Sequence, residues 1–69
     1  MTKYLQECLD YLNKKWQGKE FTPNDVFPYI TRGQYNLDRL EALGKLKARI
    51  ELEGTAPLIW TRKYYSLVS

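Results

Sequence analysis

The sequence predicts an α+β domain in which three helices precede a two-stranded β-hairpin. Three observations support this prediction. Apolar residues recur at helical spacing from Leu5 to Trp16. A second helical pattern begins after Thr31 and stops at Gly44, the kind of residue that commonly follows the end of a helix. Beyond Gly44, apolar and charged residues alternate, which indicates a strand with one buried face.

The first helix is expected over residues 3–17, with Thr2 as its N-cap and Gly18 as its end. No histidine is present to activate the thiol of Cys8, so this residue is interpreted as a small core hydrophobe. The expected buried face contains Leu5, Cys8, Leu9, Leu12 and Trp16.

The second helix is expected over residues 23–29. Thr22 is suited to the N-cap and Pro23 to the first helical position. Pro28 would remove a hydrogen bond from the helix interior, so this helix should be short or distorted. The third helix follows almost at once, which predicts a helix-turn-helix arrangement.

The third helix is expected over residues 32–43, with Thr31 and Gln34 forming a capping box. One face carries Leu37, Leu40 and Leu43, which are predicted to be buried. The opposite face offers two guanidinium groups and a phenol, with two amide side chains beside them. These polar groups belong to Arg32, Arg39, Tyr35, Gln34 and Asn36.

The hairpin is expected to pair strands over residues 46–51 and 58–65, joined by a turn over residues 53–57. The predicted buried residues are Leu46, Ala48, Ile50 and Trp60. Tyr64 and Tyr65 are adjacent on a strand, so one of the two should be buried and the other exposed.

Length and composition exclude several classes of protein. At 69 residues the chain forms one small domain, and a single cysteine without any histidine excludes a zinc finger of the Cys/His kind. There is no glycine-rich phosphate loop and no cluster of carboxylates with an obvious partner, so we expect no enzymatic activity, metal or cofactor. No apolar run approaches the roughly 20 residues of a membrane span, and no signal peptide is evident. A soluble, cytoplasmic protein is expected.

Positive charge is concentrated in the second half of the chain. Residues 1–30 carry four lysines against four acidic residues, whereas residues 31–69 carry seven basic against four acidic residues, including all four arginines. A basic half joined to a neutral half is typical of a surface that binds a polyanion.

The order of elements resembles the winged helix-turn-helix family over roughly residues 3–67. The most similar segments are Arg39–Leu46, which runs from the third helix into the first strand, and Thr22–Val26 at the start of the second helix. Trp60, followed by Tyr65 and Leu67, is similar to the closing strand of the wing. In size the chain looks like the small single-domain regulators of bacteria, phages and plasmids.

The resemblance implies a DNA-binding regulator whose third helix enters the major groove of double-stranded DNA. Such a protein would be associated with the nucleoid. Asp38 would be placed to accept a hydrogen bond from cytosine. The implied DNA-binding residues are Arg32, Gln34, Tyr35, Asn36 and Arg39 on the helix, with Lys45, Lys47, Arg49, Arg62 and Lys63 beside the phosphates.

The predicted wing tip departs from the family pattern, because it carries Glu51 and Glu53 and no basic residue. Leu52 is an apolar residue expected to be exposed there. These features favour an alternative, a winged helix that docks on proteins, either as a phage-type inhibitor or as a subunit of a nucleic-acid-processing assembly. A homodimer through the first helix or the tyrosine-rich C-terminus, and base stacking on Tyr64 or Tyr65 in an RNA-binding variant, also stay open.

Overall fold

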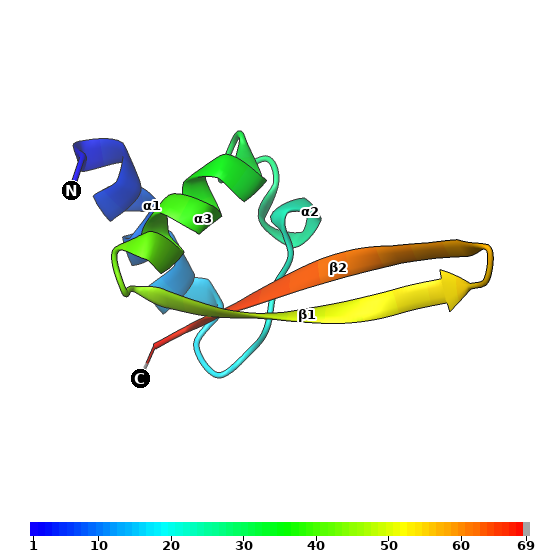
Figure 1. Ribbon diagram of the computed structural model, residues 1–69. Helices are drawn as coiled ribbons and strands as arrows, with labels where there is room; N and C mark the ends of the chain where they lie inside the picture. Colours follow the sequence, from blue (N-terminus) through cyan, green and yellow to red (C-terminus); the bar gives the residue numbers. More distant parts are fainter. Residues whose placement is uncertain (69) are drawn as a thin grey trace.

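The computed structural model describes residues 1–68 and contains three helices followed by an antiparallel hairpin, which confirms the predicted class and order of elements (Figure 1). The helices gather on one side of the hairpin base, and the rest of the hairpin projects beyond them. No helix within residues 1–68 is long and apolar enough to cross a membrane. The elements are α1 (Lys3–Lys15), α2 (Pro23–Val26), α3 (Gly33–Ala42), β1 (Leu46–Thr55) and β2 (Leu58–Leu67).

Helix α1 begins as expected, because the Thr2 hydroxyl accepts a hydrogen bond from the Leu5 N–H at 3.2 Å. It ends at Lys15, two residues before the expected position. Trp16 has left the helical conformation, with φ −126°, although its N–H still donates to the Leu12 carbonyl. Lys15 in the last turn suits the negative end of the helix dipole.

Helix α2 is a single turn with a complete capping box. The Asp25 N–H donates to the Thr22 hydroxyl, and the Thr22 N–H donates to the Asp25 carboxylate at 2.9 Å. The expected extent to residue 29 is wrong. Phe27 precedes Pro28 and is extended, with ψ 138°, because a residue before proline is disfavoured in the helical region.

Helix α3 does not begin with the capping box predicted from Thr31 and Gln34. Its N-cap position is Arg32, which adopts the left-handed conformation (φ 48°, ψ 49°) and makes no side-chain cap. The hydroxyl and N–H of Thr31 instead hydrogen-bond the Tyr4 phenol, each at 3.1 Å. The side chain that could cap α3 is therefore engaged by α1.

The end of α3 follows the sequence prediction. Gly44 has φ +77°, a conformation that side chains disfavour. Its N–H donates to the Glu41 carbonyl, and the Lys45 N–H donates to the Leu40 carbonyl, which is the hydrogen-bond pattern of a Schellman motif. This motif turns the chain directly into β1.

Both strands of the hairpin are longer than expected, with ten residues each, and Ala56 and Pro57 alone connect them. The predicted turn over residues 53–57 is wrong, because pairing continues to Thr55 and Leu58. At the base of the hairpin, Phe21 and Tyr65 exchange two backbone hydrogen bonds of 2.9 Å, so the α1–α2 connector adds a short bridge beside β2.

The core lies between the helices and the hairpin base. Tyr65 is fully buried there, whereas Tyr64 is partly exposed, as their adjacent positions predict. The buried apolar residues are Leu5, Cys8, Leu12, Phe21, Val26, Ile30, Leu37, Leu40, Leu46 and Tyr65.

Three residues predicted to be buried are exposed: Leu43 (49%), Ile50 (64%) and Trp60 (50%). Leu43 is the C-cap of α3, where the chain turns away from the core. Ile50 lies on the same face of the hairpin as Tyr65 but borders an open groove beside α2 and α3, whereas Trp60 lies opposite Glu53, on the face away from Tyr65. Alternation specifies two faces and does not specify whether anything covers either face.

Candidate nucleic-acid interface

The exposed face of α3 carries a phenol ring between two guanidinium groups. The Arg32 guanidinium carbon lies 4.6 Å from the centre of the Tyr35 ring, and that of Arg39 lies 5.5 Å from it. The three residues are three and four positions apart, so the helix places them on one face. Both cations are favourably placed over the ring while the guanidinium nitrogens keep donors free for a ligand.

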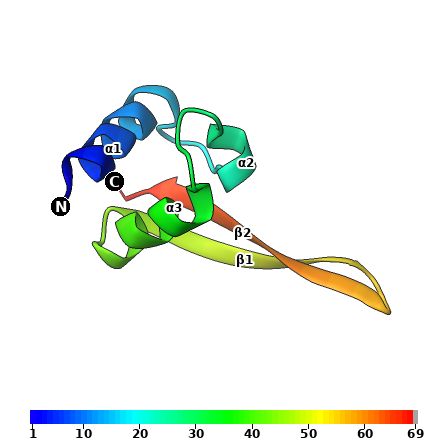
Figure 2. The same cartoon turned by 90° about the horizontal axis from the view of Figure 1, so that it is seen from above.

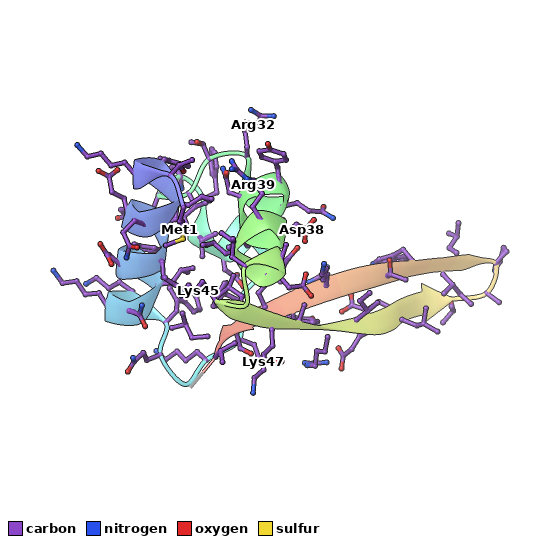
Figure 3. All side chains as sticks on the ribbon, turned by 60° about the vertical axis from the view of Figure 1, so that its left-hand side comes forward. Met1, Arg32, Asp38, Arg39, Lys45 and Lys47 are labelled. Atoms are coloured by element: carbon purple, nitrogen blue, oxygen red, sulfur yellow. The ribbon has the colours of Figure 1, made fainter. Side chains whose placement is uncertain are left out.

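Gly33 determines how closely the start of α3 approaches α2. A Cβ atom at this position would lie 2.9 Å from the Pro23 Cβ and 3.2 Å from the Pro23 Cα, closer than side chains normally pack. The absence of a side chain therefore brings the first turn of α3 against the first turn of α2. Arg32, directly before Gly33, projects at this junction (Figure 3).

Four basic residues form a strip along α3 and the start of β1, which we call the cationic strip. None of them makes a salt bridge within the described chain. Figure 3 shows them following one another from the N-terminal end of α3 to the base of the hairpin. They are Arg32, Arg39, Lys45 and Lys47, and all four are exposed.

The remaining predicted phosphate contacts are committed to ion pairs. Arg49 binds the Glu20 carboxylate through Nε at 2.6 Å and through a second nitrogen at 2.7 Å, and it also contacts Glu51 at 2.6 Å. The hydrogen bonds from Arg49 lower the pKa of Glu20. Arg62 lies 3.4 Å from Glu53. These two arginines hold the hairpin to the connector and its two strands to each other.

Lys63 fastens the hairpin to α3. Its ammonium group lies 2.8 Å from a carboxylate oxygen of Asp38 and 2.8 Å from one of Glu41. The Tyr65 phenol also donates to Asp38, at 2.5 Å. In Figure 3, Asp38 points toward the hairpin and not toward the outer face of α3. Its carboxylate is therefore bound by Lys63 and Tyr65 and does not face outward for a hydrogen bond to a base.

The protonation equilibria of this cluster reflect these contacts. Partial burial acts to raise the pKa of Asp38, but the hydrogen bonds from Lys63 and Tyr65 outweigh it and hold that pKa below its usual value. The hydrogen bonds that Lys63 makes to Asp38 and Glu41 raise the pKa of Lys63. Burial, followed by the hydrogen bond to Asp38, raises the pKa of Tyr65. The ionised carboxylate, the ammonium and the neutral phenol are thus mutually stabilised.

The structure separates the two amide residues predicted to lie beside the outer face. Asn36 is only 5% exposed, and its amide donates to the Thr31 carbonyl at 2.7 Å, so its expected position on the outer face is wrong. Gln34 is exposed and borders a groove of about 520 Å³ between α2, α3 and the hairpin. Asn36 acts on the loop before α3, whereas Gln34 is available to a ligand.

The sequence analysis did not predict the two ion pairs of Lys63 with Asp38 and Glu41, which we call the Lys63 clasp. Asp38 and Glu41 are three residues apart and therefore share a helix face, which was the available signal. Their partner could not be identified before the register between hairpin and helix was known. With this clasp, every acidic side chain of residues 31–68 has a basic partner, and the cationic strip remains uncompensated.

The sequence matches no protein-family model, and comparison with curated proteins and with solved structures finds no significant match to either.

Proposed function

We propose that this protein is a non-catalytic winged helix-turn-helix that binds double-stranded DNA and regulates transcription. The observation that carries the proposal is the cationic strip. Four basic side chains without acidic partners in the described chain follow α3 into β1, while the other three basic residues of this half are paired. An uncompensated row of cations on an exposed helix is the electrostatic pattern expected of a phosphate-binding surface.

In this proposal, α3 lies in the major groove and presents its outer face to the bases. Ten residues give a helix about 15 Å long, which fits the groove. Arg32, Tyr35 and Arg39, with Gln34 beside them, read base edges and adjacent phosphates. Lys45 and Lys47 bind the sugar-phosphate backbone at the other end of the strip.

Beyond Lys47 at its base, the hairpin, which is the wing of this fold, contributes no phosphate contact. Its basic side chains Arg49, Arg62 and Lys63 are held in ion pairs, and its last residues before the turn carry no positive charge. Arg49 and Arg62 neutralise Glu51 and Glu53, so the acidic residues repel DNA less than the sequence suggests.

The proposal is tested by binding to random-sequence duplex DNA across a salt series. If four basic residues contact phosphates, log K should fall with log salt with a slope of about −3.6. The Arg32→Ala/Arg39→Ala variant removes two of these contacts and should reduce the slope to about −1.8, with a corresponding loss of affinity at low salt.

Two matched variants make the result specific to the strip. Lys14→Ala/Lys15→Ala removes two charges from α1, outside the strip, and should leave the slope near that of the unmodified protein. Arg49→Ala removes an arginine that is already ion-paired, so it should also leave the slope near that of the unmodified protein. An equal loss in all three variants, or binding that is insensitive to salt, would refute a DNA-binding α3.

A second candidate function, docking on another protein, is favoured by the apolar residues on the hairpin. Leu52 is 75% exposed and Leu58 73% exposed, and Ile59 and Trp60 beside them are also exposed. This candidate predicts that a partner captured from the source cell is lost when Leu52 and Leu58 are both changed to Asp, while the Arg32/Arg39 variant still binds it. Retention by the double Asp variant would exclude the hairpin as the docking surface.

A further inference from the structure

The outer edge of β1 is unpaired over its whole length in the described chain. β1 pairs with β2 on one side only, and the short bridge from Phe21 adds to the far side of β2. Figures 1 and 2 show no other element beside the outer side of β1 where the hairpin projects beyond the helices. An open edge of ten residues is a template for pairing with another strand.

The register shows which backbone groups of β1 point outward. Tyr65 lies opposite Ala48 but uses its N–H and C=O on Phe21, so this is a pair without mutual hydrogen bonds. The N–H and C=O of Ala48 therefore point toward the open edge. Because such pairs alternate along antiparallel strands, the same holds for Leu46, Ile50, Leu52 and Gly54.

The charged residues of β1 are ordered so that the strand complements itself. Two basic residues, Lys47 and Arg49, precede two acidic residues, Glu51 and Glu53, with one apolar residue between each pair of neighbours. All four charges share one face, since they are two positions apart. We propose that β1 pairs antiparallel with β1 of a second copy of this chain, centred on Ile50, to form a continuous four-stranded sheet.

In this register, Lys47 lies opposite Glu53 of the second copy, and Arg49 lies opposite Glu51 of the second copy. The two-fold axis repeats both contacts, so four opposite-charge pairs form. They occupy the positions without mutual hydrogen bonds, where opposing side chains are closest. The outward-pointing backbone groups of Ala48, Ile50 and Leu52 pair with those of Leu52, Ile50 and Ala48 of the second copy, respectively, and complete the ladder.

Other registers oppose like charges. Centred on Arg49 or on Glu51, that residue would face its own copy, and centred on Leu52, Glu51 would face Glu53. Like charges directly opposite each other destabilise a strand pair. Charged residues on an edge strand usually prevent association, but here their order permits one register and disfavours its neighbours.

Pairing would also support the part of the hairpin that projects beyond the helices. An isolated two-stranded hairpin is marginally stable in water, and three or more strands with an apolar face are stable. Ile50 and Leu52 are 64% and 75% exposed and share the opposite face from the charges. In the paired sheet Ile50 would lie opposite Ile50 of the second copy, and Leu52 would lie opposite Ala48 of the second copy. Because the axis is perpendicular to the sheet, both sets of helices would lie on one face.

The test is sedimentation equilibrium of charge-reversed chains without DNA. Lys47→Glu alone and Glu53→Lys alone each place two like-charge pairs in the dimer, and each should weaken self-association about tenfold or more. An equimolar mixture of the two variants restores opposite charges at every position and should dimerise like the unmodified protein. Lys3→Glu, the same charge change on α1, should leave the association constant unchanged.

Each outcome decides the proposal. An unmodified chain that stays monomeric up to near-millimolar concentration, a mixture that does not associate, or variants that dimerise normally would overturn it. Lys47 also belongs to the cationic strip, whereas Glu53 does not. Glu53→Lys therefore tests pairing independently of the proposed DNA binding, and failure of one proposal leaves the other testable.

Amide hydrogen exchange tests the register directly. In the dimer, the amides of Ala48, Ile50 and Leu52 should be protected, and in the Glu53→Lys variant they should exchange quickly. The amides of Arg49 and Glu51 point toward β2 and should be protected in both. Protection of all five amides in the Glu53→Lys variant would contradict an open β1 edge.

Discussion

Arg32 holds a left-handed backbone conformation that costs most residues about 1–2 kcal/mol. It lies at the N-cap of α3 and makes no side-chain capping hydrogen bond, so its side chain does not stabilise the start of the helix. Its guanidinium lies over Tyr35 at the exposed end of the cationic strip. Backbone strain at an exposed cation is consistent with a role in binding.

We predict that Arg32→Gly separates stability from binding. Glycine adopts φ 48° without strain, so the free energy of unfolding should stay the same or rise by up to about 1 kcal/mol. DNA affinity at low salt should fall, because one cation of the strip is lost. Urea unfolding and duplex binding measure the two effects. A glycine variant that binds DNA normally would remove Arg32 from the interface.

At the scale of the element, α3 is positioned by its neighbours more than by its own sequence. Its N-terminal turn packs against Pro23 through Gly33, and its C-terminal turn leads through Gly44 directly into β1. Within the described residues, Tyr35 and Arg39 on the outer face of α3 are exposed, while Leu37 and Leu40 on the opposite face are buried.

The Gly33→Ala substitution should destabilise the fold by about 1–3 kcal/mol, despite the higher helix propensity of alanine. The new methyl group would overlap the rigid Pro23 ring, so α2 and α3 would have to separate. Thermal or urea unfolding measures the loss. Gln34→Ala, the next position along the helix and exposed, should change stability by less than about 0.5 kcal/mol. A Gly33→Ala variant as stable as the unmodified protein would show that α2 and α3 do not pack tightly at this position.

At the scale of the whole molecule, one cluster joins the helices to the hairpin. Tyr65 is fully buried, pairs with Phe21 through the backbone and donates through its phenol to Asp38. Lys63 adds two ion pairs to the same side of α3. The angle between α3 and the hairpin therefore depends on this cluster.

The depressed pKa of Asp38 predicts how stability depends on acid pH. Its ionised form is favoured in the folded protein, so its contribution is present above the usual pKa, about 3.9, and is lost as pH falls further. Asp38→Asn should be less stable than the unmodified protein at neutral pH, and the difference should shrink as pH falls below about 4.

Urea unfolding from neutral to acid pH measures this difference. Glu7→Gln on α1 is the matched control, because Glu7 makes no salt bridge within residues 1–68. This variant should have the same free energy of unfolding as the unmodified protein at every pH. A difference between the Asp38→Asn and unmodified proteins that is constant with pH would assign the loss to packing instead.

The order of elements could be predicted because each is encoded locally. Thr2 and Thr22 begin helices, Gly44 ends one, and alternation follows it, all of which the structure retains. The cap predicted at Thr31 failed, because the Tyr4 phenol, 27 positions away, takes that hydroxyl. A local motif predicts a cap only when no distant partner competes for the same group.

The class of fold, the buried face of α1 and the position of Leu37 and Leu40 in the core could all be predicted from the order of residues alone. These features depend on periodicity and on residues close in the chain. Which basic side chains lack an acidic partner could be known only from the folded arrangement of the described residues. Arg49 and Arg39 look alike in the sequence, but Arg49 forms an ion pair with Glu20 across the fold, whereas Arg39 lies over the Tyr35 ring and makes no salt bridge within residues 1–68. Ion pairing depends on which distant side chains come within a few ångströms, and that distance exists only once the hairpin has docked on the helices.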